Sequence, residues 1–486
     1  MTTIDDTDGA ATGTGSHPHQ PDQAYQRRLL GVVMLAVMAF GSLMTIVTVS
    51  LDEIAGDLGS SRATLTWMIT GLMLAMAVLT PVAGKLGDVR GHRRMFLIGL
   101  TGGVVFTVAS ALAWDAASMI TFRVLFGITG AFVMPNGMSL MMHAYGPQRR
   151  ATAMGWYQFA MTGAPTIGLV IGGPLIDVVG WRWIFVAFAV ISMLALAVGA
   201  RLIRPTPTLG DVPIDYVGAA TLGGAVLTGL LALTRVSQLL RDGGGETAAT
   251  DPAALVLVAL SAAGIAAFVV VERRSTAPML QLRYFRRRNF TLPMVSSSLG
   301  QFAYMGGFVV TPALLGNLYG YGIGAIALLL AARPGVFSLA SPLGGYLATS
   351  MGERLPLVVG AAAMVASMAA FAAGSAFTGT AGVVVIVVGL MLSGASAGVS
   401  QPAVASMVVG AVDSGDMGIA NGMSQQIMFI GIVSGIQTMN VFLGDDATSS
   451  QFVATFVFGG VVAVAGLVAA MAARDPSRTP TPLDSL

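Results

Sequence analysis

The sequence contains no cysteine and only four histidines among its 486 residues. Without thiols there can be no disulfide, no thiol nucleophile and no thiolate metal site, and the histidines lack the paired spacing of metal ligands. We also find no pairing of a nucleophile with a base, and no phosphate-binding loop. We therefore expect that the chain is not an enzyme and that it uses no cofactor and no metal.

Charged side chains are also scarce, at 10% of the residues, whereas 55% of the residues are hydrophobic. A chain of this composition cannot fold around one aqueous core and needs lipid around it. Its apolar stretches of about 20 residues match the roughly 30 Å of hydrocarbon that a helix must cross. The strands of a barrel would be about 10 residues long and would alternate apolar with polar residues. The composition therefore predicts an all-α membrane protein.

About fourteen segments are long and apolar enough to cross a membrane. They lie near 29–51, 64–83, 95–113, 118–141, 152–176, 182–201, 216–236, 253–271, 290–316, 323–348, 356–374, 381–410, 418–443 and 451–473. An even number of crossings puts both ends of the chain on the same side. Residues 1–28 have no apolar run, so we expect a disordered cytoplasmic tail there, and a second cytoplasmic tail at 474–486.

The 24 arginines and the single lysine leave a net charge of +2. They form short clusters between the apolar segments, and threading the chain from a cytoplasmic N-terminus places most of them in the cytoplasm, as the positive-inside rule requires. We therefore interpret the basic residues as signals of topology, with the bilayer and not a nucleic acid as the partner. The excess of arginine over lysine is typical of a GC-rich bacterial genome, which favours a location in the plasma (inner) membrane.

An internal repeat divides the chain. The stretch PVAGKLGDVRGHRRMFLIG at 81–99 reappears as PLGGYLATSMGERLPLVVG at 342–360, and each copy joins an even-numbered segment to the next. Weak internal symmetry of this kind marks transporters whose substrate site lies between two halves. We expect a six-helix bundle at 29–205, a second at 289–473, and between them two inserted helices and a basic linker at 206–288.

The first copy of the repeat contains a motif. Its glycines permit a tight turn and a close approach of helices, its carboxylate can pair with a donor, and its arginines hold the loop in the cytoplasm; the motif residues are Gly84, Asp88, Arg90, Gly91, Arg93 and Arg94. The segment resembles the signature loop between helices 2 and 3 of the major facilitator superfamily.

Further stretches match that family in the same order along the chain. Arg123 resembles part of its helix 4 motif, and the helix 5 antiporter motif is represented by Gly168, Gly172 and Gly173. With the two inserted helices, the chain is similar to the fourteen-helix drug:proton antiporter branch. That resemblance implies export of amphiphilic compounds by alternating access, driven by protons.

The chain departs from that branch at the position of its usual proton site, because Leu43 stands where an aspartate is common. A proton-coupled exporter needs a group that titrates in a cavity of low dielectric constant. We find no Asp, Glu, Lys or His at mid-depth in the predicted segments. The nearest candidates are Asp52 and Glu53 at the outer end of the first segment, with Arg123 as a possible partner; a solvated helix end is the alternative for both carboxylates.

Polar side chains within the segments are candidates for the substrate cavity. Arg333 corresponds through the repeat to Leu72, so we expect it to line the cavity, although a fixed structural contact is the alternative. Uncharged polar residues can bond across helices in the same way; the candidates are Gln158, Gln301, Tyr304, Gln425 and Gln426.

We expect an exporter of hydrophobic or amphiphilic compounds that is proton-coupled and works as a monomer. The alternative is an exporter of lipids or lipid precursors with atypical or no proton coupling, which the apolar first half favours; a membrane sensor or scaffold is a third possibility. If the outside is open, Asp88 should lie at the N-terminus of the helix near Gly418, where helix N–H groups and the helix dipole attract a carboxylate. We expect Asp416 to weaken that contact.

Overall fold

The computed structural model describes residues 23–60, 62–65, 67–208, 210, 215–241, 250–275, 278, 282–377, 379–441 and 447–474. The side chains of a few helical residues within these ranges, among them 164–178 and Asp52, are also outside the description. All regular structure in the described part is helical. The prediction of an all-α bundle is therefore confirmed.

The described residues of the N-terminal half form seven helices, two of them short. They are α1 (Gln23–Val49), α2 (Leu51–Asp57), α3 (Arg62–Leu65), α4 (Trp67–Arg90), α5 (His92–Ala111), α6 (Ala116–Val179) and α7 (Trp181–Leu202). Helix α1 begins at Gln23, six residues before the predicted first segment, so the end of the predicted disordered tail is helical.

Two of the predicted segments are joined in α6. Gly146, with φ 67° and ψ 176°, breaks the helix into two arms, and a positive φ is a conformation that glycine adopts without steric cost. The hydroxyl of Tyr157 donates to the Met134 carbonyl at 3.2 Å, which places the two arms side by side. Thirteen helices of the described part are long and apolar enough to span a membrane. Counting the arms of α6 separately gives the predicted fourteen crossings.

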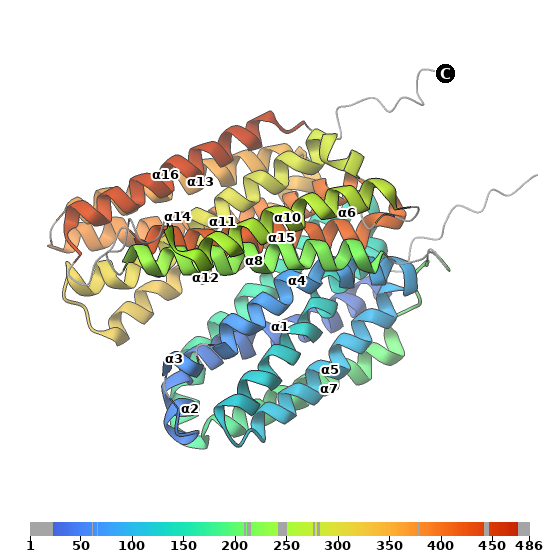
Figure 1. Ribbon diagram of the computed structural model, residues 1–486, viewed down its shortest axis with the longest axis horizontal. Coiled ribbons are helices and arrows are strands. Elements are labelled where there is room, and N and C mark those ends of the chain that lie inside the picture. Colours follow the sequence, from blue (N-terminus) through green and yellow to red (C-terminus); the bar gives the residue numbers. More distant parts are fainter. Residues whose placement is uncertain are drawn as a thin grey trace, which may run out of the picture.

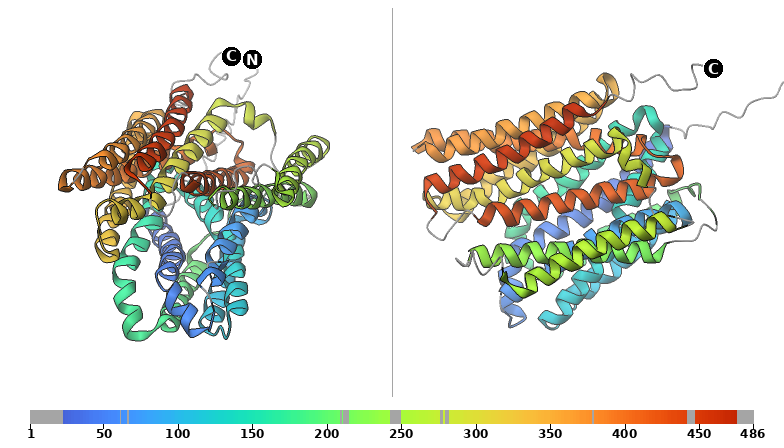
Figure 2. Two further views of the ribbon diagram at one scale, coloured as in Figure 1. Left: turned by 60° about the vertical axis from the view of Figure 1, so that its left-hand side comes forward. Right: turned by 45° about the horizontal axis from the view of Figure 1, so that its top comes forward.

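The inserted pair consists of α8 (Tyr216–Arg241) and α10 (Pro252–Arg274). Helix α8 packs against α4, α15 and α10. In the most apolar stretch of α10, by contrast, only 11% of the residues are buried within the protein. Figure 2 shows the pair projecting from the side of the molecule. The inserted helices thus lie at the edge of the bundle, with α10 outermost.

The C-terminal half repeats the plan of the first. It contains η1 (Leu282–Arg286), α11 (Arg288–Asn317), α12 (Ile323–Met351), α13 (Arg354–Ala376), α14 (Gly379–Gly410), η2 (Ser414–Asp416), α15 (Met417–Val441) and α16 (Ser449–Ala472). Helix α1 begins and α16 ends at the same end of the bundle, on the right in Figure 1. We call this end the termini side and the opposite end the far side.

The two halves meet on the termini side and diverge toward the far side (Figure 1). On the far side each half has its own apolar core. The first is built from α1 to α7 around residues such as Phe40 and Leu65, and the second from α11 to α16 around Phe371 and Phe456. Phe429 of α15 packs on the first core from the other half. The fold is therefore two helical bundles that meet on the termini side and separate toward the far side.

Candidate functional site

The first contact between the halves is the α4–α15 junction, formed by Gly84 and Asp88 of α4 with Gly418 and Ile419 of α15. A Cβ atom on Gly84 would collide with the Gly418 carbonyl, so the two backbones touch. The carboxylate of Asp88 accepts hydrogen bonds from Gly418 N at 2.7 Å and Ile419 N at 2.9 Å. These N–H groups begin α15 and have no partner within the helix, which is why a carboxylate is stable there. The predicted contact of Asp88 with Gly418 is confirmed.

Asp88 is held in place by a buried chain of polar groups. Asn136 donates both amide hydrogens, to the Ala83 and Phe132 carbonyls, so its oxygen faces His92 Nδ1 at 2.9 Å. The other ring nitrogen of His92 lies 3.3 Å from Asp88 Oδ1. The motif predicted Asp88 but not Asn136, which lies 48 residues later on another helix. In the sequence, the one feature that distinguishes Asn136 is that it is a polar residue inside an apolar segment.

The rest of the predicted loop is structural or exposed. Gly91 has φ 94°, the left-handed conformation that ends one helix and begins the next. Arg93 donates to the Ala200 carbonyl at 2.7 Å and so ties α5 to the end of α7. Arg90 and Arg94 are exposed. The six motif residues are thus close in space, but only Gly84 and Asp88 reach the other half.

A second junction lies on the opposite flank, between the second arm of α6 and α12. The hydroxyls of Thr152 and Thr349 are 2.9 Å apart. Arg150 donates to the Ser406 hydroxyl of α14 at 2.8 Å, and its guanidinium lies 3.8 Å from Glu353. None of these residues was predicted from the sequence as a contact between the halves. The second copy of the repeat, which contains Thr349 and Glu353, lacks the basic pattern that identified the first copy. The two junctions close the termini side on both flanks.

Gln425 and Gln426 were expected in a cavity, but in this conformation they bridge the halves. Gln425 donates to the Met138 sulfur at 3.3 Å and Gln426 to the Ala77 carbonyl at 3.1 Å. Only 8% and 1% of these residues is exposed, because α15 presses this face against α4 and α6. Gln158 lies half-buried in the second arm of α6.

Arg333 of α12 is buried within the C-terminal half, with 2% of its surface exposed. Its guanidinium carbon lies 3.2 Å from the ring centre of Tyr304 and 4.4 Å from that of Phe308, both on α11. Aromatic faces attract a cation. Nε and Nη2 have no hydrogen-bond partner in the described part of the chain. In this conformation α11 covers the guanidinium, and the expectation that Arg333 lines the central cavity stays a prediction.

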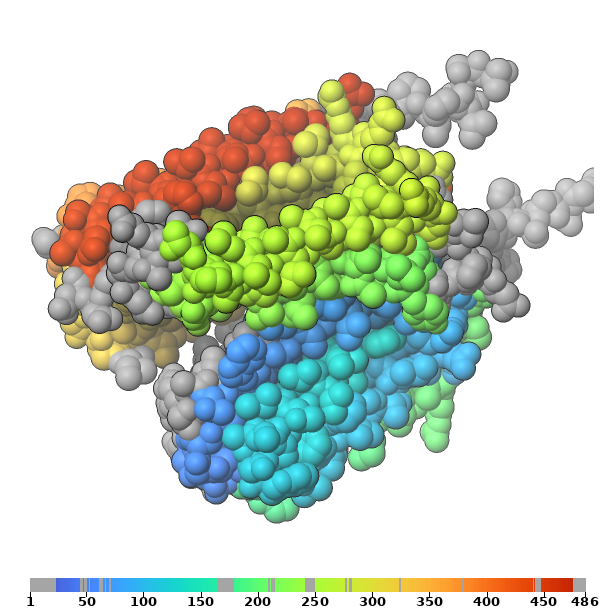
Figure 3. All heavy atoms as spheres, in the orientation of Figure 1, coloured from blue at the N-terminus to red at the C-terminus, as the bar shows by residue number. Residues whose placement is uncertain are grey.

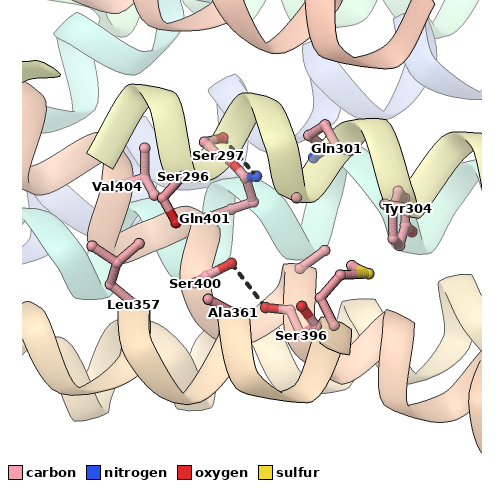
Figure 4. Close-up of a pocket in the computed structure, with 13 residues that line it drawn as sticks. Ser296, Ser297, Gln301, Tyr304, Leu357, Ala361, Ser396, Ser400, Gln401 and Val404 are labelled. Carbon is pink, nitrogen blue, oxygen red and sulfur yellow. Dashed lines mark hydrogen bonds between the residues drawn. The ribbon is translucent and has the colours of Figure 1, made fainter. Parts of the chain in front are cut away.

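Tyr304 also borders a small polar chamber between α11, α13 and α14 (Figure 4). The chamber has a volume of about 20 Å³, enough for one water molecule. Gln401 donates to Ser297 at 3.2 Å on its wall, and the side-chain oxygen of Gln301 has no partner among the described residues. Gln301 and Tyr304, both predicted from the sequence, thus lie at one polar site, whereas Gln158, Gln425 and Gln426 do not line it.

Arg123 of α6 is the second buried guanidinium, with 1% exposed. It lies 4.9 Å from the Phe126 ring centre and 5.9 Å from that of Phe185. Its Nε and Nη1 lack a hydrogen-bond partner in the described part. Glu53 is exposed on α2. The Asp52 side chain and the surroundings of Gly168, Gly172 and Gly173 lie outside the described residues.

Comparison with known proteins places this geometry in a family. The model of the Major Facilitator Superfamily matches residues 31–436. The tetracenomycin C resistance and export protein of Streptomyces glaucescens is 28% identical over 85% of this chain and 74% of its own length. The multidrug transporter protein MdtP of Bacillus subtilis is 29% identical over 69% of this chain, and the match spans 61% of its length. For the multidrug export protein EmrB of Haemophilus influenzae the identity is 29%, over 65% of this chain and 61% of that protein.

Solved structures share the fold. The human organic anion transporter MFSD10 (TETRAN) superposes with a TM-score of 0.60 at 16% identity, covering 90% of this chain and 99% of that one. The proton:xylose symporter XylE gives a TM-score of 0.61 at 13% identity, over 91% and 95% of the two chains. The family model matches well over half of the chain, the helices span a membrane many times, and two bundles meet at the signature loop. This multi-pass membrane protein therefore belongs to the major facilitator superfamily.

Proposed function

We propose that the chain exports hydrophobic or amphiphilic compounds across the plasma membrane by alternating access. Relatives named for antibiotic and multidrug export support this, among them the Streptomyces glaucescens and Haemophilus influenzae proteins. The division into two bundles that touch at one end supports the mechanism. The observation that carries the proposal is the bond of Asp88 to Gly418, because it joins the two halves through a buried carboxylate at the start of α15.

The proposed orientation puts the termini side in the cytoplasm. The loops there carry the arginine clusters, including Arg90, Arg94 and Arg204, in agreement with the positive-inside rule. The structure then represents the state that is closed to the cytoplasm. In this state Asp88 acts as a latch, because opening to the cytoplasm must pull its carboxylate away from two N–H donors.

Arg333 is the proposed anchor for a polar head group. A guanidinium inside a membrane protein is costly without a partner, and two of its nitrogens have no hydrogen-bond partner in the described part of the chain. An anionic or zwitterionic amphiphile would supply acceptors once α11 and α12 part. Proton coupling at Asp52 and Glu53, with Arg123 as their partner, is the second element of the proposal.

The test is transport of a fluorescent amphiphile in proteoliposomes with an imposed pH gradient. We expect wild-type export to follow the gradient and Asp88→Asn to lose at least about tenfold in rate, since a neutral amide loses the attraction of the helix N-terminus. Asp115→Asn is the matched control, because that carboxylate caps a helix on the far side at Ser118. Wild-type rates in Asp88→Asn, with normal amounts of protein, would show that the junction is not a latch.

A further inference from the structure

The inserted helix α8 encloses a cavity of about 370 Å³ against α4 and α15. In Figure 3 the inserted pair, in green, lies along the line where the two halves face each other. The walls come from all three helices: Trp67, Met73, Leu74 and Ala77 from α4, Leu230, Leu231, Thr234 and Gln238 from α8, and Phe429, Ile432, Val433, Ile436 and Gln437 from α15. The size falls in the range of small-molecule pockets.

The cavity occupies only the far half of this contact. Toward the termini side α8 packs tightly, because Ala219 shares an apolar core with Ile419 of α15. A Cβ atom on Gly223 would lie 2.8 Å from Val78 Cγ1, so α4 and α8 are in direct contact there. The three helices are therefore packed together on the termini side and leave the cavity between them on the far side, where Trp67 and Gln437 line it.

The lining is apolar with an uncharged polar end. Gln437 donates to the Thr234 hydroxyl at 3.4 Å, and Gln238 lies one turn further along α8. Among the described residues that line the cavity, none is charged. The nearby Arg235 is paired with Asp251 at 3.1 Å. A phosphate head group would find no free cation on these walls, whereas an uncharged molecule with an aromatic body and a hydrogen-bonding group fits them.

Two walls of the cavity belong to opposite halves. Ala77 of α4 lines it and also accepts the cross-half bond from Gln426. Helices α4 and α15 carry the Asp88 junction as well, so any separation of the halves must change the shape of the cavity. A molecule bound here is therefore coupled to the conformational change, unlike a lipid that only coats the outer surface.

We propose that this cavity is a lateral binding site for the uncharged, apolar part of the exported amphiphile, through which it passes into the outer leaflet. The proposal rests on the proposed function for its direction. It gives the inserted helices a role, since α8 supplies the third wall. The occupant is the exported compound and not a bilayer phospholipid.

The test uses two fluorescent probes that differ by one charge, N-phenyl-1-naphthylamine, which is neutral, and 1-anilinonaphthalene-8-sulfonate, which is anionic. Binding is measured at equilibrium on the full chain in nanodiscs, by energy transfer from the five tryptophans of the protein. Of these, Trp67 lies on the cavity wall and is 49% exposed. We expect Val433→Trp to fill the cavity and weaken binding of the neutral probe at least about tenfold, the loss from excluding one aromatic ring. Leu255→Trp on the lipid-facing side of α10 is the control and should bind as the wild type does.

Leu231→Trp fills the same cavity from α8 and guards against misfolding of the first variant. Trp67→Phe should remove more of the energy transfer to the bound neutral probe than Trp114→Phe, which lies outside the cavity, and this difference places the probe at the Trp67 wall. Unchanged affinity in both filled variants would overturn the proposal. So would native mass spectrometry that shows a co-purified phospholipid lost from Val433→Trp but not from Leu255→Trp. Because binding is measured without transport, a wild-type result in the Asp88 assay would contradict the export mechanism and leave this site standing.

Discussion

Lys85 Nζ lies 3.0 Å from Asp416 Oδ1, across the boundary between the two halves. Lys85 is the single lysine of the chain, and both side chains are largely buried. The hydroxyl of Tyr284 donates to the other Asp416 oxygen at 2.8 Å. Burial, together with hydrogen bonds to Asp416 and Asp413, raises the pKa of Tyr284 to about 12 and keeps it a donor. Asp416 thus has its own cation, which offsets the repulsion that we expected it to exert on Asp88; the expected weakening of the Asp88 contact stays a prediction.

The pair leads to a charge-removal prediction. Lys85→Ala leaves Asp416 buried without its cation, and losing one partner of such a pair costs about 3 kcal/mol or more. We expect that variant to populate the cytoplasm-open state and to export several-fold more slowly. The double variant Lys85→Ala with Asp416→Ala should recover part of the loss, because no charge is left unpaired. Distances between spin labels on the two sides of the junction measure the populations of the open and closed states. A double variant that exports no faster than Lys85→Ala would contradict the prediction.

The repeat predicted more than the topology. Arg93 and Arg354 are equivalent positions, and the structure gives them equivalent bonds, to the Ala200 carbonyl of α7 and the Met471 carbonyl of α16, both at 2.7 Å. Gly91 and Gly352 share φ values of 94° and 93°. Turn glycines and loop arginines are predictable because their role depends on local geometry and on topology.

Other features depend on packing between distant helices. The cover over Arg333 comes from Tyr304, 29 residues earlier on another helix. Nothing in the spacing of α12 shows which neighbour faces that side. Gln425 and Gln426 bridge the two halves in this structure. Under the proposed alternating access, the same residues would line a cavity in one state and an interface in the other. A sequence does not specify which state a structure represents.

The absence of cysteine makes the second junction directly testable. Thr152 and Thr349 hydroxyls lie 2.9 Å apart, so cysteines at both positions bring two sulfurs within reach of a disulfide. We expect the Thr152→Cys with Thr349→Cys variant to cross-link under oxidation and to lose transport to background. Reductant should restore it. Each single cysteine variant is the control, and cross-linked protein that still transports would show that this flank does not open.

A stability prediction concerns the far side. The hydrogen bond from Arg182, helped by one from Trp181, lowers the pKa of Asp57 below its usual value. A carboxyl whose pKa is depressed in the folded state stabilises the fold above its unfolded pKa, near 4, and loses this contribution as the pH falls through the folded value. Arg182→Gln should therefore lower thermal stability at pH 7, by at most about 1 kcal/mol because both groups are half exposed. The difference from wild type should shrink as the pH falls below about 4 and through the lowered pKa of Asp57; a difference that stays constant over this fall in pH would contradict the prediction.

Substrate charge is the next prediction. Arg333 has unpartnered nitrogens and, in the described part of the chain, no carboxylate among its hydrogen-bond or ion-pair partners. We expect anionic and zwitterionic amphiphiles to be exported in preference to permanent cations such as ethidium. Arg333→Ala should remove this preference, whereas Arg333→Lys should keep part of it, because the charge remains but the planar fork is lost. Competition assays between amphiphiles that differ only in the charge of the head group measure this preference. Efficient ethidium export that is insensitive to Arg333→Ala would refute the assignment of Arg333 as the head-group anchor.

Proton coupling is the last prediction, and it concerns the outer end of the first helices. Asp52 and Glu53 are consecutive residues of α2, and Arg123 lies in the same half. A carboxylate near a guanidinium stays ionised, whereas desolvation favours its protonated form, so a movement that alternates the two environments loads and releases a proton. The apolar surroundings of Arg123, beside Phe126 and Phe185, support such an environment.

The measurement is the pH dependence of export in Asp52→Asn, Glu53→Gln and the double variant. Replacing the proton-binding carboxylate should flatten the profile, because the neutral side chain cannot release a proton in either state. Asp57→Asn is the matched control on the same helix, since that carboxylate is held by Arg182. Its profile should remain that of the wild type. If Asp52→Asn, Glu53→Gln and the double variant all keep the wild-type profile, the carboxylates of α2 stay in water in both states and the transporter does not bind its proton there.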